Sequence, residues 1–71
     1  MTENPTAKKI GKRLKAIRSE KKLTQAIVAE KAGINTNYYA KIERGEVAPS
    51  PETYEKIAKA LKVTAADIFP F

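Results

Sequence analysis

The segment over residues 23–45 restricts the fold most, because it carries the start and stop signals of two short helices joined by a tight turn. Thr24 is a favoured N-cap residue, since its hydroxyl can accept a hydrogen bond from a free backbone N–H. Gly33 supplies the left-handed conformation that commonly ends a helix. Asn35 is a second favoured N-cap and starts a helix over residues 35–44, which another glycine follows. Helical hairpins occur in many small bundles, so this segment alone does not indicate a function.

Similar signals predict three further helices. A first helix over residues 6–21 has apolar residues at spacings of three and four, which mark a single face: Ala7, Ile10, Leu14 and Ile17. Ser50 followed by proline favours the start of a fourth helix, and Thr64 with an aspartate three residues later favours a last single turn. No segment alternates with the period of two that marks a strand. We therefore expect an all-α domain of five short helices over residues 6–71, preceded by a flexible N-terminus over residues 1–5.

Two adjacent tyrosines in the second helix of the hairpin must face different directions. Neighbouring residues of a helix do not share a face, so only one of Tyr38 and Tyr39 can point inward. Ile34 and Tyr39 flank Asn35 at the spacing of a hydrophobic staple, which favours Tyr39 in the core and Tyr38 outside. Ile27 stands at the third position of the preceding helix, where a capping box would have Glu or Gln, and we expect it to be partly exposed.

The composition of the 71 residues excludes several classes of function. Cysteine and histidine are both absent, so neither a disulfide framework nor a Cys/His metal site can form. No acidic run has the spacing of an ion-binding loop, so we expect no metal and no cofactor. Acid–base catalysis would depend on surface glutamates that no pocket tunes, so we do not expect an enzyme. No apolar run approaches the roughly 20 residues of a membrane span or forms a signal-peptide core, so we expect a cytoplasmic protein without a membrane partner.

The net charge of +6 indicates a polyanionic partner, and its distribution is more informative than its size. Residues 1–22 carry eight basic and two acidic side chains, whereas residues 23–71 carry six of each. The whole excess therefore lies on the first helix and its flanks. Lysines on an exposed helix face can also serve only solubility, so the charge alone leaves both interpretations open.

Several short motifs follow one another in a fixed order over most of the chain. They are LTQ (23–25) at the start of the hairpin, AG (32–33) at its turn, IERG (42–45) at its end and PS (49–50) before the fourth helix. Together they resemble the Cro/repressor-type (XRE) family of helix-turn-helix DNA-binding domains, over about residues 10–69. The chain departs from the family pattern at Ile27, where the family often has Glu, and at Lys62, where it often has Gly.

The resemblance implies a lambda-repressor-like fold in which helices 2 and 3 form the helix-turn-helix. In this family the third helix enters the major groove, and residues near its N-terminus reach base edges. The matching positions here are Thr36, Asn37 and Tyr38, with Lys41 one turn further on. Asn37 can form two hydrogen bonds with adenine, and Lys41 can donate to guanine or to a phosphate.

Other residues are candidates for phosphate contacts or for structural support. The phosphate candidates are Gln25, Asn35 and Arg44 in the hairpin and, in the basic first helix, some of Lys8, Lys9, Lys12 and Arg13, of which we favour Lys9 and Arg13. Gln25 is physically suited because it stands at a helix N-terminus, which attracts anions. Arg18 and Glu43 match a pair that forms a structural salt bridge in the family.

We expect sequence-specific binding to double-stranded DNA, by a transcriptional regulator of the repressor type. A homodimer on two half-sites about one helical turn apart is expected, through the end of the fourth and fifth helices near Phe69 and Phe71. Closure of the core is the simpler explanation of Phe69. One alternative is an antitoxin that binds DNA and a protein toxin, with Ile27 as a contact. Another is a protein-interaction module, which is expected to expose more apolar surface than this sequence offers.

Overall fold

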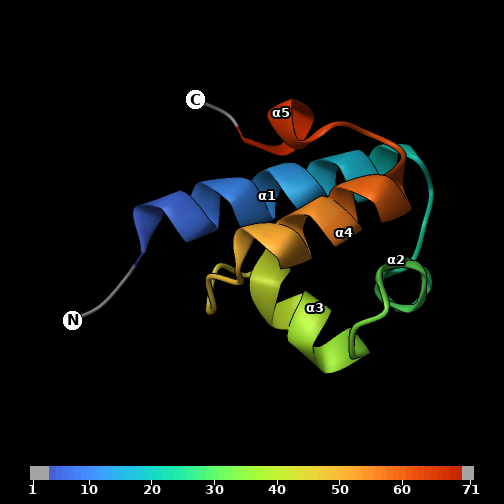
Figure 1. Ribbon diagram of the computed structural model, residues 1–71, viewed down its shortest axis with the longest axis horizontal. Helices are drawn as coiled ribbons and strands as arrows, with labels where there is room; N and C mark the ends of the chain where they lie inside the picture. Colours follow the sequence, from blue (N-terminus) through green and yellow to red (C-terminus); the bar gives the residue numbers. More distant parts are fainter. Residues whose placement is uncertain (1–3, 70–71) are drawn as a thin grey trace.

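The computed structural model describes residues 4–69, which form five α-helices and no strand (Figure 1). The helices are α1 (Pro5–Glu20), α2 (Gln25–Ala32), α3 (Thr36–Glu43), α4 (Pro51–Leu61) and α5 (Ala65–Ile68). The predicted all-α fold and the order of its helices are confirmed.

Each helix begins after a side chain that accepts a hydrogen bond from the backbone three residues later. Thr24 and Asn35 accept at 3.1 and 3.2 Å, and Ser50 and Thr64 accept at 3.3 Å each. These are the four N-caps that the sequence predicts. Asn4 caps α1 in the same way at 3.1 Å, so this helix begins one residue before the predicted start. The predicted flexible N-terminus stays a prediction, because its residues 1–3 lie outside the described residues.

The first four helices end in the same way, at a residue with positive φ. The φ angles are 58° at Lys22, 74° at Gly33, 75° at Gly45 and 60° at Lys62. In each case the next N–H donates to a carbonyl oxygen five residues back, at 2.9 to 3.1 Å. Lys22 and Lys62 therefore adopt a conformation that costs a residue with a Cβ roughly 1–2 kcal/mol.

The core draws on all five helices. α2 packs against α3 and α4, α3 also packs against α1, and α5 packs against both α1 and α4 (Figure 1). The large side chains that are fully buried are Tyr39, Leu14, Ile42, Ile57, Leu61, Ile68 and Val28. The burial of Tyr39 was predicted from its staple position.

Two aromatic rings close the core beside α5. The rings of Tyr54 and Phe69 pack edge to face, with centroids 5.6 Å apart and an interplanar angle of 81°. Such pairs contribute beyond the apolar area that they bury. This contact favours core closure as the role of Phe69. Phe71, the other aromatic residue of the predicted dimer surface, lies outside the described residues.

α1 and the end of α3 approach each other almost backbone to backbone. A Cβ added at Gly11 would lie 2.6 Å from the carbonyl oxygen of Ile42 and closer still to that of Glu43. A Cβ at Gly45 would lie 2.6 Å from Cγ of Lys8. Both distances are shorter than any side chain tolerates, so glycine sets the spacing of these two helices. Sequence pattern did not indicate this role of Gly11, because its contacts at Ile42 and Glu43 lie more than 30 residues away.

Within residues 4–69, no helix has the length and apolar character needed to cross a bilayer. The same residues contain no group of three acidic side chains placed to hold a metal ion.

Candidate nucleic-acid interface

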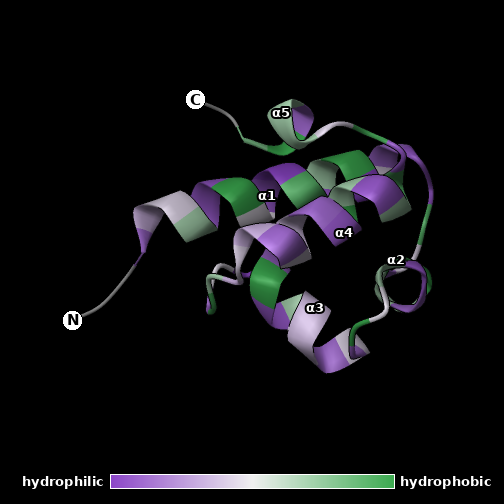
Figure 2. Cartoon of the chain, in the orientation of Figure 1, coloured by the Kyte–Doolittle hydropathy of each residue, from purple (hydrophilic) through white to green (hydrophobic). Residues whose placement is uncertain are grey.

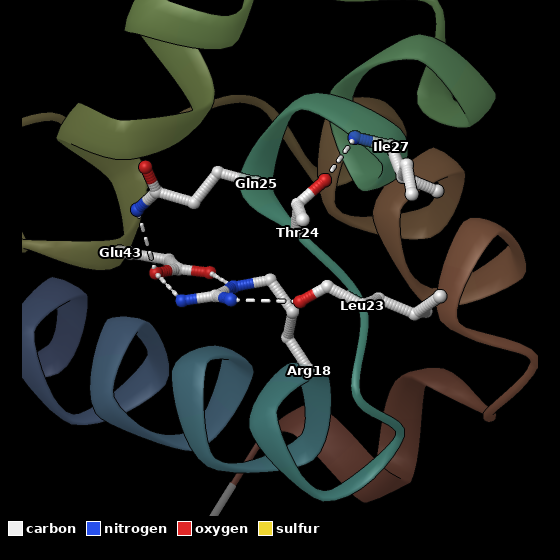
Figure 3. Close-up of polar contacts among 6 residues, drawn as sticks. All are labelled: Arg18, Leu23, Thr24, Gln25, Ile27 and Glu43. Carbon is white, nitrogen blue, oxygen red and sulfur yellow. Dashed lines mark hydrogen bonds and ion pairs between the residues drawn. The ribbon is translucent and has the colours of Figure 1, made fainter.

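A buried ion pair fixes the C-terminal end of α3 to α1. Arg18 Nε lies 2.7 Å from Glu43 Oε2, and Arg18 Nη2 donates to Glu43 Oε1 at 3.2 Å (Figure 3). Arg18 Nη1 donates to the carbonyl oxygen of Leu23 at 2.9 Å. The side chains of Arg18 and Glu43 are only 14% and 2% exposed. One guanidinium therefore connects three segments: α1, the residue before the helical hairpin, and α3.

Gln25 joins this pair from the first position of α2. Its Nε2 donates to Glu43 Oε1 at 3.0 Å, as Figure 3 shows. The amide nitrogen carries two hydrogens, so this bond occupies one of them and leaves the second for another acceptor. Glu43 thus holds the amide of Gln25 in one orientation at the N-terminus of α2.

The network keeps its charges at neutral pH. Burial alone would raise the pKa of the Glu43 carboxyl, but the hydrogen bonds from Arg18 and Gln25 outweigh burial and lower the pKa. The hydrogen bond with Glu43 likewise raises the pKa of Arg18. Burial, followed by the nearby Glu43 carboxylate, raises the pKa of Tyr39, whose hydroxyl oxygen has no hydrogen-bond partner among residues 4–69. Arg18 and Glu43 are therefore charged and Tyr39 is neutral.

The outward face of α3 has the opposite character. All four predicted base-edge candidates are exposed: Thr36, Asn37, Tyr38 and Lys41. Figure 2 shows the start of α3 in purple and white, whereas a green band appears toward its other end. The structure therefore brings these four residues onto an open surface.

Asn35 first serves the helix itself. Its Oδ1 accepts the N–H of Tyr38, which leaves the amide nitrogen as a donor for other partners.

A cationic pocket lies between α1 and the two ends of the helical hairpin. It encloses about 420 Å³ and is lined by Lys8, Lys12, Lys15, Gln25, Glu43 and Arg44. Gln25 and Arg44 were predicted as phosphate contacts, and Lys8 and Lys12 were among the candidates in the first helix. Lys15 was missed, although its distance of three residues from Lys12 and seven from Lys8 places all three on one helix face.

Arg44 lies at the rim of the pocket in a second ion pair. Its Nε lies 2.7 Å from Glu46 Oε2, and its Nη2 donates to Glu46 Oε1 at 3.3 Å. The side chains are 54% and 51% exposed. The hydrogen bond to Arg44 lowers the pKa of Glu46. The sequence did not indicate that this carboxylate would pair with the predicted phosphate contact.

Lys9 and Arg13, the two residues favoured in the first helix, do not line the pocket. Arg13 points toward α5 instead, where its Nε donates to the carbonyl oxygen of Asp67 at 2.8 Å. Lys9 is exposed on α1 outside the pocket lining. Helical geometry explains the difference, since positions 9 and 13 lie on a different face of α1 from positions 8, 12 and 15.

Ile27 is exposed on α2, as expected from its position in the first turn. Ile27 is 39% exposed, and Tyr38 is 36% exposed. These are the two large hydrophobic side chains that are exposed among the described residues. Two separate side chains do not amount to a large apolar patch.

Comparison with known proteins places this architecture among regulators. Residues 14–68 match the helix-turn-helix family HTH_3. The chain is similar to the immunity repressor protein of Bacillus phage phi105, with 48% identity over 59 residues. It is also similar to the HTH-type transcriptional repressor RghR of Bacillus subtilis (strain 168), with 39% identity over 54 residues.

These similarities cover most of this chain but a smaller part of the two repressors. The matches span 83% and 75% of the chain, and 41% and 40% of the respective repressors. A solved structure is similar over nearly its whole length: the restriction-modification controller protein C.AhdI from Aeromonas hydrophila. Its TM-score is 0.86 at 32% sequence identity, over 89% of this chain and 96% of that one.

Proposed function

Because the chain belongs to the HTH_3 helix-turn-helix family, we propose that it binds double-stranded DNA sequence-specifically and regulates transcription, as a repressor. α3 is the element that enters the major groove. The observation that carries this proposal is the contrast between the two faces of α3. Its inner face is held to α1 and α2 through the buried bonds of Glu43, while its outer face presents polar side chains to solvent.

The exposed face of α3 has the chemistry of base recognition. Asn37 offers an amide that can donate to and accept from adenine, and Lys41 can donate to guanine. Thr36 can contact a base edge or the methyl group of thymine. Tyr38 adds an exposed ring with a polar tip beside them. Because the helix is short and fixed at its C-terminal end, these side chains meet the groove in one orientation.

The phosphate contacts come from the edges of the same surface. The second amide hydrogen of Gln25 is available beside the N-terminus of α2, where free N–H groups attract an anion. Asn35 and Arg44 flank it at the start and the end of α3. Such contacts fix the position of the domain on the duplex without reading its sequence.

Useful affinity requires a second copy, because one recognition helix covers a single half-site. We therefore propose a homodimer on DNA. The full regulators similar to this chain are longer than the segment that matches it, so the activity of a complete regulator is part of the proposal.

The alternatives receive less support. An antitoxin or an interaction module needs a protein-binding surface, and the described residues expose only Ile27 and Tyr38 as large apolar side chains. An enzyme is disfavoured for a different reason, because the family consists of regulators and the acidic side chains near the pocket are engaged in ion pairs.

Selection of bound DNA from a random pool tests the proposal. We expect enrichment of a palindromic sequence, as a symmetric dimer requires. Asn37→Ala and Lys41→Ala should then weaken binding to the selected site far more than binding to random duplex. Equal losses of affinity for the selected site and for random duplex would mean that these residues contact phosphates and do not read bases. Failure to enrich any sequence would refute sequence-specific recognition.

A further inference from the structure

We propose that the cationic pocket beside the hairpin is a second binding surface for DNA phosphates, and that α1 therefore extends the interface beyond the helix-turn-helix. The proposal rests on the proposed function and adds a surface to it. Its main part is the α1 lysine row, which we define as Lys8, Lys12 and Lys15.

The row lies beside two of the predicted phosphate contacts. The three lysines form one wall of the pocket, and Gln25 and Arg44 line it from α2 and the end of α3. The row spans seven residues, or about 10 Å of helix, which is enough to reach more than one phosphate of a strand. A backbone that contacts Gln25 and Arg44 would therefore also pass the lysine row.

The lining of the pocket is mostly cationic. Lys8, Lys12, Lys15 and Arg44 are cationic, and Gln25 supplies an amide donor. Glu43 is the one acidic residue of the lining, and both of its oxygens already accept hydrogen bonds from Arg18 or Gln25. Each of the other side chains of the lining carries N–H donors, and the oxygens of a phosphodiester are acceptors. The pocket thus suits a phosphate backbone.

The positive charge of the chain is concentrated near α1. The entire excess of positive charge lies in residues 1–22, outside the hairpin that carries the recognition helix. Three of the eight basic residues of that segment line the pocket. A role in DNA binding explains why a helix outside the helix-turn-helix is so basic.

The close approach at Gly11 brings the lysine row near the end of α3. A Cβ at this position would lie 2.6 Å from the carbonyl oxygen of Ile42, so only glycine allows α1 to pack this closely. The row and the recognition helix are therefore near enough to contact one duplex together.

The test compares two triple variants with the same change in net charge. The first, Lys8→Gln/Lys12→Gln/Lys15→Gln, removes the row. The control, Lys21→Gln/Lys31→Gln/Lys62→Gln, removes three lysines that line a different open pocket of about 260 Å³. Affinity for a random-sequence duplex is measured by fluorescence anisotropy between 50 and 300 mM salt.

We expect the row variant to lose on the order of 10- to 100-fold in affinity at low salt. The slope of log K against log salt should become shallower by about two to three, since each phosphate contact contributes about 0.9. The control should keep the slope of the unmodified chain. Replacing the row by arginines, which preserve the charge, should restore both affinity and slope.

Equal losses of affinity in the row variant and the control would overturn the proposal, because the lysines would then act only through the net charge of the protein. A row variant that binds like the unmodified chain would overturn it as well. The proposed function fails separately, if the unmodified chain shows no salt-dependent binding to duplex DNA. Because Lys8 contacts Gly45, the Lys12→Gln/Lys15→Gln double variant repeats the test without disturbing that contact.

The absence of cysteine from the chain allows a direct test of placement. A cleavage reagent attached at Lys12→Cys should cut the DNA backbone beside the bases that α3 reads on a selected site. The same reagent at Lys62→Cys should leave those positions intact. Identical cleavage patterns from the two positions would overturn the proposal.

Discussion

The ion pairs Arg18–Glu43 and Arg44–Glu46 have the same chemistry and nearly the same geometry, but they lie in different surroundings. In each pair the guanidinium Nε lies 2.7 Å from a carboxylate oxygen, and a second nitrogen bonds the other oxygen. The first pair is largely buried and the second is about half exposed. A buried pair is costly to break because it leaves an unpaired charge behind, whereas water screens an exposed pair. The same contact therefore holds the fold together in one place and leaves an arginine available in the other.

Glu43→Ala should have the largest effect, a loss of about 3–5 kcal/mol in the free energy of unfolding. It leaves the buried guanidinium of Arg18 without its partner and releases the amide of Gln25. Urea unfolding monitored by circular dichroism measures the loss. Glu46→Ala is the matched control and should leave the unfolding midpoint nearly unchanged. Comparable losses in both variants would contradict the difference between the pairs.

Arg18→Lys should cost less, about 2 kcal/mol, because lysine keeps the charge but loses the planar fork. An ammonium group cannot bond both oxygens of Glu43 and the carbonyl of Leu23 in the present geometry. Arg44→Lys should not change the unfolding midpoint measurably, because water replaces the lost hydrogen bonds. If Arg18→Lys is as stable as the unmodified chain, the triple contact of Arg18 does not contribute to stability.

The pH dependence of the free energy of unfolding should show a smaller effect of the buried pair than the substitutions of Glu43 and Arg18 described above. Since the pKa of Glu43 is lowered on folding, its contribution is fully present above the unfolded value near 4.5 and is lost as the pH falls through the folded pKa. The unmodified chain should therefore lose stability in acid more steeply than Glu43→Gln. Urea unfolding from pH 7 to pH 3 measures both curves. Parallel curves would show that Glu43 does not titrate with folding.

Glu46→Gln should have the smallest effect on stability and a measurable effect on DNA binding. Removing the carboxylate frees Arg44 for a phosphate and removes a negative charge from the edge of the interface. We expect roughly 3- to 10-fold tighter binding to random duplex at low salt, in line with the loss of one unfavourable charge near the backbone. Anisotropy titrations measure the change. Unchanged affinity would mean that Arg44 does not contact DNA.

The parts of this structure that depend on short-range bonds were predictable from the sequence. Each predicted cap bonds a residue only three positions away, so Thr24, Asn35, Ser50 and Thr64 act with little influence from the rest of the fold. The inward position of Tyr39 followed from the staple around Asn35. Local pattern was sufficient for these features.

Contacts between distant segments were harder to predict. The hydrogen bond from Arg13 to the carbonyl oxygen of Asp67 joins residues 54 positions apart. Because every residue has a backbone carbonyl, the sequence does not identify which one accepts. The close approach at Gly11 depends on how α1 crosses α3. The pocket that includes Lys15 also depends on that crossing, although the spacing of the three lysines was visible. Side-chain type identified the cations, but only the packing of helices determined which of them face the hairpin.

The close approach of α1 and α3 at Gly11 also has a consequence for the DNA that the domain is proposed to bind. If α1 contacts phosphates as proposed, this close packing sets the distance between its lysine row and α3. A duplex that reaches both helices would have to match this distance, and the free energy of deforming DNA varies with sequence even at positions that no side chain touches. The flexibility of the bound DNA, and not only its base edges, would then help to determine which sites are bound.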